Sequence, residues 1–116
     1  MKVNDCLFCK IINQEIVSDY VLETNKIIVI NDINPQAPEH FLIIPKKHIP
    51  TLDELKYEDV GLVGEMIFTA SKLANDKGLS NSGYRTILNC KEAGGQTVFH
   101  IHLHLLGGRE LNWPPG

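Results

Sequence analysis

Three of the five histidines of this chain stand at every second position of one short segment. Residues 100–106 read HIHLHLL, and Gly107-Gly108 follows them directly. Strict alternation of polar and apolar residues is the period of a β-strand with one buried face. We therefore predict a strand over residues 99–106, with its aliphatic side chains in a core. The three imidazoles then share the opposite face, at a spacing of about 6.6 Å.

A row of imidazoles on one strand face favours chemistry over packing. A neutral imidazole is a nucleophile and an imidazolium is a proton donor, and an ordinary pKa of about 6.5 makes both forms accessible near neutral pH. The alternative is structural, because a single histidine in such a position is more often buried and hydrogen-bonded. Three in a row point to a functional site.

Length and composition limit what the chain can be. Its 116 residues are enough for one domain, which we expect to span residues 1–116. Hydrophobic residues make up 43% and charged residues 22%, as is usual for a soluble globular protein. The net charge of −3 argues against a general nucleic-acid binder, although one phosphate could still bind locally. We expect a cytoplasmic protein without a membrane partner, because the sequence contains neither an apolar run of about 18 residues nor a signal-peptide pattern.

The periodicity of the chain predicts an α+β fold. In chain order we expect a short helix, three strands, one long helix and two further strands: 7–13, 17–23, 26–32, 40–45, 58–77, 84–89 and 99–106. The long helix has apolar residues at helical spacing, and Gly78 is suited to end it. This order indicates a five-stranded antiparallel sheet with the long helix on one face.

Two short motifs add candidate ligands. Gly94-Gly95 stands before the histidine row, and glycines let a backbone approach a ligand closely. Their amides, the Gln96 side chain and the Thr97 hydroxyl could hold phosphate oxygens, although such a motif alone is more often a turn. Near the N-terminus, Cys6 and Cys9 form a C-x-x-C pair. In a reducing compartment this favours a metal over a disulfide, and the alternative is two small buried residues on a short helix.

Together these motifs resemble the histidine triad (HIT) family, and most closely its histidine triad nucleotide-binding (Hint) branch. The resemblance rests on the histidine row, on residues 31–49 (NDINPQAPEHFLIIPKKHI) and on the ending from Gly107 to Gly116, with its Trp113-Pro114-Pro115-Gly116. It covers nearly the whole chain. It implies a single HIT domain with a HIT-like fold.

The resemblance implies a purine nucleoside phosphoramidase, or nucleotidyl hydrolase, that releases a nucleoside 5′-monophosphate. His102 would be the nucleophile and would form a covalent nucleotidyl-histidine intermediate. His104 would bind the phosphate and assist proton transfer at the leaving group, and His40 would complete the proton network. No metal would be required at the phosphorus, and the partner would be an AMP or GMP derivative.

The resemblance also implies a set of nucleotide contacts. Base, ribose and phosphate would be held by Phe8, Ile11, Asp32, Ile33, Asn89, Gly95, Gln96, Thr97, His102, His104 and Trp113, with Ile30 also near the base. Asp32 would bind the ribose hydroxyls. Thr97 stands where this branch usually has serine, and Asn34 and Cys90 receive no role. Relatives of this kind are homodimers, with an interface from the long helix and the 84–89 strand, and their C-terminal segment reaches toward the partner's active site.

A structural zinc site is expected at the C-x-x-C pair. Once the other three histidines are assigned to catalysis, His48 and His100 remain, and some prokaryotic members resemble this chain in binding zinc at the same four positions. Cys6, Cys9, His48 and His100 would form a closed tetrahedral set that leaves no position for a catalytic water.

Three other functions remain open at this stage. The chain could be a nucleotide-binding regulatory module whose hydrolysis is incidental, or a dinucleoside polyphosphate hydrolase. It could also be a metallohydrolase, since two strand histidines at i and i+2 can share one ion. The sequence does not distinguish adenine from guanine, because apolar walls discriminate purines weakly.

Overall fold

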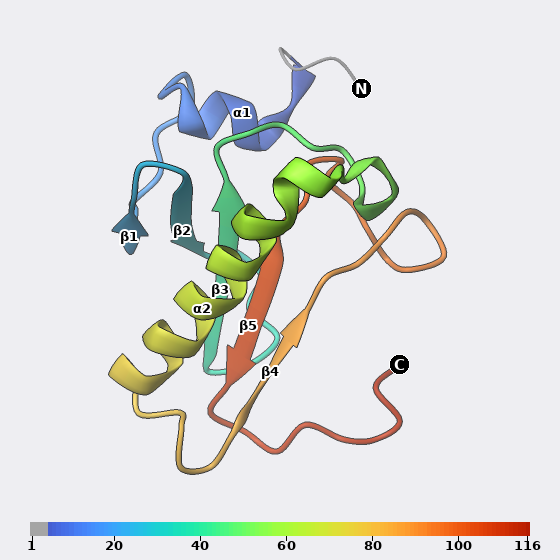
Figure 1. Ribbon diagram of the computed structural model, residues 1–116. Coiled ribbons are helices and arrows are strands. Elements are labelled where there is room, and N and C mark those ends of the chain that lie inside the picture. The colour runs from blue at the N-terminus through green and yellow to red at the C-terminus, as the bar shows by residue number, and fades with distance from the viewer. Residues whose placement is uncertain (1–4) are drawn as a thin grey trace.

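The computed structural model describes residues 5–116 and contains one antiparallel sheet of five strands (Figure 1). The sheet order is β1-β2-β3-β5-β4, and every neighbouring pair is antiparallel. The helices and strands are α1 (Leu7–Ile12), β1 (Leu22–Glu23), β2 (Ile27–Asn31), β3 (Glu39–Pro45), α2 (Val60–Asp76), β4 (Tyr84–Ile87) and β5 (Leu103–Gly107). Short 3-10 turns at Leu52–Glu54 and Tyr57–Asp59 lead into α2. The predicted α+β architecture is confirmed.

The long helix is shorter than predicted at both ends. It starts at Val60 instead of 58, because the Asp59 carboxylate accepts a hydrogen bond from the Lys56 backbone N–H and so stabilises a 3-10 turn. It ends at Asp76, and Gly78 follows in the left-handed region with a φ of 76°. That conformation is the usual helix stop, as the sequence indicated. No helix within residues 5–116 is long and apolar enough to cross a membrane.

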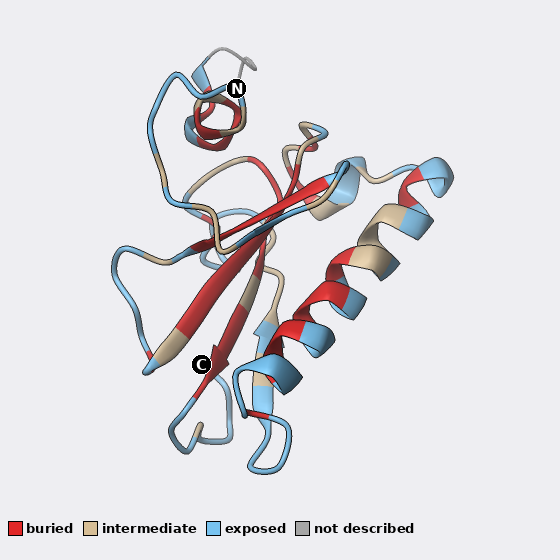
Figure 2. Ribbon diagram, turned by 90° about the vertical axis from the view of Figure 1, so that its left-hand side faces the viewer, coloured by how far each residue is buried: buried red, intermediate tan, exposed pale blue. Residues whose placement is uncertain are grey.

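Two hydrophobic cores lie on opposite faces of the sheet (Figure 2). The larger one lies between the sheet and α2, which buries Met66, Ala70 and Leu73 against it. The smaller one lies beneath α1 and contains Phe8 and Ile11. Strands β2 and β3 contribute to both cores. This explains why they read as continuous aliphatic runs instead of alternating.

The first strand is much shorter than predicted. We expected a strand over 17–23, but only Leu22–Glu23 pairs with β2. The preceding residues leave the sheet and run beside α1, where the Tyr20 hydroxyl donates to the Ile11 carbonyl at 2.9 Å. Residues 17–21 therefore have the composition of a strand but lie outside the sheet.

Candidate active site and metal centre

The histidine row lies at the start of β5 and in the extended segment before it. The strand begins at Leu103, so the predicted start at residue 99 is wrong. The ladder with β3 pairs Leu103 with Ile43, and two positions further it would meet Pro45, which has no backbone N–H to donate. The Ile101 N–H donates instead to the Ile49 carbonyl at 2.8 Å.

The predicted alternation of faces is confirmed. The aliphatic residues lie in the core beneath α2: Ile101, Leu103 and Leu105. The rings of His100 and His102 lie on the other side, edge-on to the Phe8 ring of α1, with centroid separations of 5.9 and 4.9 Å. The His104 ring lies 5.0 Å from that of His102. The first two histidines of the row are buried and the third is half-buried.

A backbone contact sets which ring nitrogen of His102 carries the proton. Its Nδ1 lies 2.7 Å from the His100 carbonyl oxygen, which can only accept a hydrogen bond. The ring proton therefore sits on Nδ1, and Nε2 keeps its lone pair. A neutral imidazole with an unused Nε2 lone pair is the form that a nucleophile requires.

A second chain of hydrogen bonds fixes the proton of His104. The backbone N–H of Gln36 donates to Nδ1 of His40 at 3.0 Å, so the ring proton of His40 is on Nε2. That nitrogen lies 2.9 Å from Nδ1 of His104, which accepts. His104 therefore carries its own proton on Nε2, the position of a hydrogen-bond donor. The Asp32 carboxylate lies 3.4 Å from Nε2 of His40.

All three of these imidazoles are neutral at neutral pH. Burial lowers the pKa of His40 and of His102 below the ordinary value, although Asp32 opposes this effect at both rings. Burial, reinforced by the nearby His102 and His40, lowers the pKa of His104 to about 4. Loss of hydration disfavours the charged form, which is why partly buried histidines titrate at lower pH.

A cavity of about 400 Å³ opens beside these rings. Seven of the residues that the sequence singled out line it: Phe8, Ile11, Asp32, Ile33, Thr97, His102 and His104. Its lining combines apolar side chains with two imidazoles and a carboxylate, the usual construction of a small-ligand site. Ile30 also lines it, and Ile33 is fully exposed at its edge.

The other expected contacts lie outside that lining. The side-chain amide of Gln96 is buried and donates to the carbonyls of Pro50 and Val98, while its oxygen accepts from the Lys91 N–H. It therefore holds its own loop together. Gly95 has a φ of 87°, and an added Cβ would meet the Asn89 side chain at 4.0 Å. Trp113 is 81% exposed in the isolated chain.

Sequence reasoning missed part of the cavity wall. The missed residues are Leu7, Ile16, Val17, Ser18, Asn31, Leu42 and Val98. Two of them, Val17 and Ser18, belong to the predicted strand over 17–23. The signal that could have identified them is Ser18-Asp19, a polar pair that interrupts the supposed strand and favours a loop.

A larger hollow of about 590 Å³ lies between α2 and β1, away from the histidines. Its lining includes Phe68, Lys72 and Asp76, and it contains no histidine or cysteine. If volume were the only criterion, this hollow would be chosen as the candidate active site over the cavity beside the histidines. The smaller cavity is the better candidate because it brings nucleophilic and proton-donating groups together.

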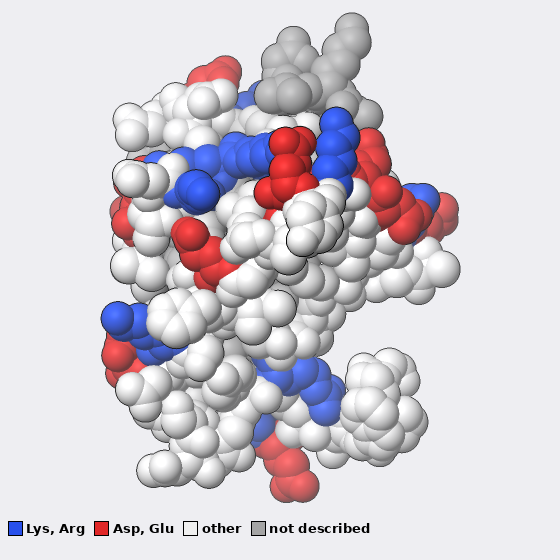
Figure 3. All heavy atoms as spheres, in the orientation of Figure 1, with Lys and Arg blue, Asp and Glu red and all other residues white. Residues whose placement is uncertain are grey.

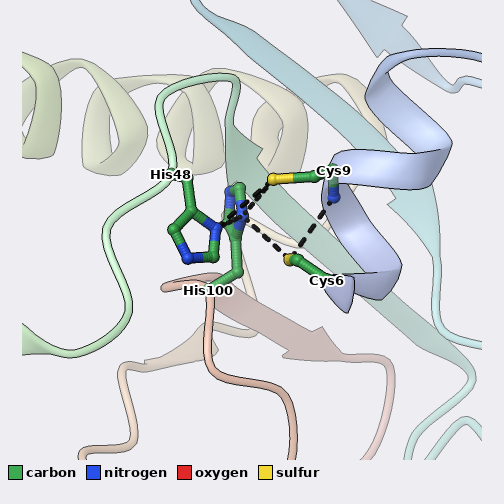
Figure 4. A group of neighbouring side chains, drawn as sticks. All are labelled: Cys6, Cys9, His48 and His100. Atoms are coloured by element: carbon green, nitrogen blue, oxygen red, sulfur yellow. Dashed lines mark hydrogen bonds between the residues drawn. The ribbon is translucent and has the colours of Figure 1, made fainter. Parts of the chain in front are cut away.

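The second cluster brings together the four expected metal ligands (Figure 4). The two cysteines lie at the start of α1, where Sγ of Cys6 caps the helix by accepting from the Cys9 N–H at 3.4 Å. His48 lies in the loop after β3, and His100 precedes β5. Figure 4 shows all four side chains pointing toward one another.

The spacing of this cluster fits a tetrahedral metal ion. Sγ of Cys9 lies 3.3 Å from Nδ1 of His48, and Sγ of Cys6 lies 3.4 Å from Nδ1 of His100. The two Nδ1 atoms are 3.1 Å apart. Ligand atoms around tetrahedral zinc are about 3.4 to 3.8 Å apart, given bonds of about 2.1 and 2.3 Å, so the four side chains need to separate by only a few tenths of an ångström to admit the ion. The donor set and the geometry therefore fit a closed zinc site.

The surroundings of the cluster agree with that chemistry. Nε2 of His100 donates to the Pro45 carbonyl at 2.7 Å, which leaves Nδ1 free and gives the outer contact typical of a metal-bound imidazole. Burial lowers the pKa of His100 to about 4 and, with help from Cys6, raises the pKa of Cys9 to about 11. A metal would displace the thiol protons.

Asp32, His40 and His104 also bring three possible ligand atoms within 4.8 Å of one another. The two nitrogens involved are 2.9 Å apart, which is a hydrogen-bond length that uses both atoms. This geometry favours a shared proton over a shared metal ion.

Known proteins share both the sequence and the fold. The family model described as "Scavenger mRNA decapping enzyme C-term binding" matches residues 5–111. An uncharacterized HIT-like protein of Synechococcus elongatus is 48% identical over 112 residues, covering 97% of each chain. The purine nucleoside phosphoramidase of Escherichia coli K12 is 47% identical over 107 residues, covering 92% of this chain and 90% of that protein. The chain belongs to the histidine triad (HIT) family.

Solved structures of HIT proteins have the same fold. The HIT family hydrolase from Legionella pneumophila superposes with a TM-score of 0.93 at 52% identity, covering 96% of this chain and 99% of that one. A histidine triad protein from Clostridium difficile gives a TM-score of 0.90 at 41% identity, with 97% of both chains covered. This HIT protein is therefore a hydrolase, as the family resemblance predicted.

Proposed function

We propose that this HIT hydrolase is a purine nucleoside phosphoramidase that acts through a covalent nucleotidyl-histidine intermediate. The observation that carries the proposal is the pairing of a free Nε2 on His102 with an Nε2–H on His104 beside a half-apolar cavity. The 47% identity to the Escherichia coli phosphoramidase supports the substrate class.

The reaction proceeds in two displacements. Nε2 of His102 attacks the α-phosphorus, the P–N bond breaks, and the leaving nitrogen takes a proton from water in the open cavity. Water then attacks the nucleotidyl-histidine, the bond from Nε2 to phosphorus breaks, and one proton returns to the solvent. The products are a nucleoside 5′-monophosphate and an amine. Two displacements replace one difficult step by two easier ones.

His104 stabilises the phosphoryl group in both displacements. Its Nε2–H donates to a phosphoryl oxygen, on which charge changes during each transfer. In this proposal the Nε2–H serves as a hydrogen-bond donor to the phosphate, and the leaving nitrogen takes its proton from solvent. His40 keeps His104 in the required tautomer through the 2.9 Å contact between the two rings.

The cavity accommodates a nucleotide in one orientation. Phe8 and Ile11 line the cavity and take the base, while Asp32, whose carboxylate lies 3.4 Å from Nε2 of His40, takes the ribose hydroxyls. The Thr97 hydroxyl approaches the phosphate. The backbone N–H groups of Gly95 and Gln96, expected as phosphate donors, instead donate to the Glu92 and Lys91 carbonyls of their own loop. AMP and GMP derivatives are both accepted, because the walls around the base are apolar.

The four-ligand cluster binds structural zinc. Cys6, Cys9, His48 and His100 supply two thiolates and two imidazoles, a complete set for tetrahedral zinc. When bound, the ion supplies a cross-link between α1, the loop after β3 and the segment before β5. Catalysis needs no metal at the phosphorus.

The chain functions as a homodimer. Exposed apolar side chains follow one side of α2, among them Val60, Ile67 and Phe68, and β4 is an edge strand with an exposed Tyr84. Figure 3 shows a broad uncharged area on this face, with mixed charges along its upper edge. As the family resemblance implies, the C-terminal segment of each chain, with its exposed Trp113, would reach toward the partner's cavity.

The decisive experiment measures AMP release from adenosine 5′-phosphoramidate by the native protein and by His102→Ala. We expect turnover by the native protein and a loss of about a thousandfold or more in the variant. Thermal melting and AMP binding, both expected near native values, control for folding. Equal turnover by the two proteins would overturn the assignment of the nucleophile.

The same assay separates the alternative functions. Binding of AMP without any turnover would identify a nucleotide-binding regulatory module instead of a phosphoramidase. Faster cleavage of a dinucleoside polyphosphate than of the phosphoramidate would assign the chain to that hydrolase class. Comparing the adenosine and guanosine phosphoramidates measures the base preference.

A further inference from the structure

Arg109 is an exposed residue that touches the loop before β3. Its Nε donates to the Gln36 carbonyl at 2.9 Å, and one of its terminal nitrogens donates to the Glu110 carbonyl at the same distance. It reaches this loop because β3 and β5 are antiparallel, with Glu39 opposite Gly107. The end of β5 therefore lies beside the start of β3.

The glycine before Arg109 makes this approach possible. Gly108 has a φ of 95°, and a Cβ at this position would lie 3.0 Å from Cβ of Pro38. Only glycine adopts that backbone conformation without strain while packing this closely. The segment after β5 is thus pressed against the loop, and the Arg109 hydrogen bond holds the two together.

The loop that Arg109 holds carries the donor that fixes His40. The Gln36 N–H donates to Nδ1 of His40, whereas the carbonyl of the same residue accepts from Arg109. The loop has further internal bonds, from the Asn34 N–H to the Asp32 carboxylate and from the Gln36 side chain to the Asn34 carbonyl. The hydrogen bond from Arg109 to the Gln36 carbonyl joins this loop to the segment that follows β5.

We infer that Arg109 is a positioning residue for the histidine pair, acting through the Gln36 amide to keep the outward Nε2 of His104 protonated. Without the Gln36 donor, His40 can carry its proton on Nδ1 and accept at Nε2. His104 then carries its proton on Nδ1 and turns a lone pair toward the phosphoryl group. This inference rests on the proposed function, in which that nitrogen donates to the phosphate.

The test compares the two arginines of the chain. Arg109→Met removes the hydrogen bond to the loop, whereas Arg85→Met is the matched control. Arg85 donates to the Asn112 carbonyl at 2.9 Å, and so holds the same C-terminal segment without touching the loop. For Arg109→Met we expect kcat to fall about tenfold with KM within about twofold, the size expected for weakening one hydrogen bond. Arg85→Met should retain native kcat.

A spectroscopic measurement tests the tautomer directly and does not depend on turnover. In the native protein, ¹⁵N NMR of the histidine rings should give an unprotonated Nδ1 and a protonated Nε2 for His40. In Arg109→Met both signals should move toward intermediate values. A chain with an ester in place of the amide before Gln36 removes the donor itself and should give the same shift.

The pH profile supplies a third measurement. The groups that face His40 are the Asp32 carboxylate and the His104 ring. The Gln36 N–H opposes protonation at Nδ1, so loosening it should move the acid limb of the kcat profile to higher pH. A purely structural role for Arg109 would lower stability and leave this limb in place.

Three outcomes would overturn the inference: an unchanged His40 tautomer in Arg109→Met, a rise in KM at constant kcat, or the same loss in Arg85→Met. If the native protein did not hydrolyse phosphoramidates at all, the proposed function would fail. The NMR comparison would still decide whether Arg109 controls the tautomer.

Discussion

The metal cluster and the cluster beside the cavity each contain a histidine of the same segment, His100 and His102. These two histidines differ in which ring nitrogen is left free. His100 donates from Nε2 to Pro45, so its Nδ1 faces Cys6 in a closed, buried cluster. His102 donates from Nδ1 to the His100 carbonyl, so its Nε2 is free beside the cavity. Identical side chains thus acquire different chemistry from the backbone carbonyl that each one meets.

The two clusters are also both bounded by α1. Helix α1 supplies both cysteines to the metal cluster and supplies Phe8 and Ile11 to the cavity. A change in one cluster is therefore expected to reach the other in a defined way, through the position of α1 and not through the imidazole chemistry. The experiments that follow test this separation.

The largest effect is expected at the histidine cluster beside the cavity. His104→Ala should lower kcat by about a hundred- to a thousandfold, because the phosphoryl group loses a preorganised donor. The loss should be similar for a phosphoramidate and for a p-nitrophenyl ester of AMP, whose leaving group needs no proton. A loss confined to the phosphoramidate would make His104 a general acid instead.

A smaller effect is expected from the metal cluster. Cys9→Ser, or removal of the metal by a chelator, should lower the free energy of unfolding by about 3 kcal/mol and raise KM about tenfold. The kcat of the folded protein should stay near the native value. Metal analysis, urea denaturation and steady-state kinetics measure the three quantities.

Cys90→Ser is the matched control for that substitution. Cys90 is a free, half-buried thiol outside both clusters, and its replacement should leave metal content, stability and KM unchanged. If Cys9→Ser lowered kcat as strongly as His104→Ala, the two clusters would not be separable, and the metal would take part in the chemistry.

The acid sensitivity of the fold should reflect the buried imidazoles. The pKa of His104 is lowered to about 4 in the folded chain, while an unfolded histidine titrates near 6.5. Between these values the unfolded chain binds more protons, so stability is complete above about pH 6.5 and is lost as the pH falls toward 4.

For the partly exposed ring of His104 this loss should amount to about 2 kcal/mol, after allowing for solvent screening. Urea denaturation between pH 4.5 and pH 7.5 measures it, and His104→Gln should make the curve flatter by that amount. An identical pH dependence in the variant would show that other groups cause the acid sensitivity.

The smallest effect is expected at Thr97, which lines the cavity and is exposed. Thr97→Ser keeps the hydroxyl and should change kcat/KM less than about threefold, whereas Thr97→Val removes it and should cost about tenfold. Equal values for the two variants would mean that this hydroxyl does not touch the phosphate.

Periodicity predicted the parts of the molecule whose backbone bonds are regular. The alternation of His102 and His104 with Leu103 and Leu105 correctly identified the two faces of β5. The end of the ladder at Pro45 could also have been inferred, because proline lacks a backbone donor.

The remaining parts depend on contacts between distant residues. The side-chain amide of Gln96 faces inward because it donates a hydrogen bond to the Pro50 carbonyl. Pro50 is distant in the sequence, and nothing near Gln96 indicates this contact. Val17 and Ser18 lie outside the sheet and line a cavity whose wall also includes Phe8 and Ile11 of α1. The roles of His40 and Asp32 entered through family resemblance, because no local pattern marks them.

The segment from His100 to His104 contributes histidines to both clusters, and these histidines stand at every second residue. The number of residues between them is therefore fixed. Inserting one residue before His102 would turn every following side chain to the opposite face, with leucines toward the cavity and imidazoles in the core under α2. A one-residue insertion between His100 and His102 would therefore change the spacing between the two clusters and turn the rings of His102 and His104 away from the cavity.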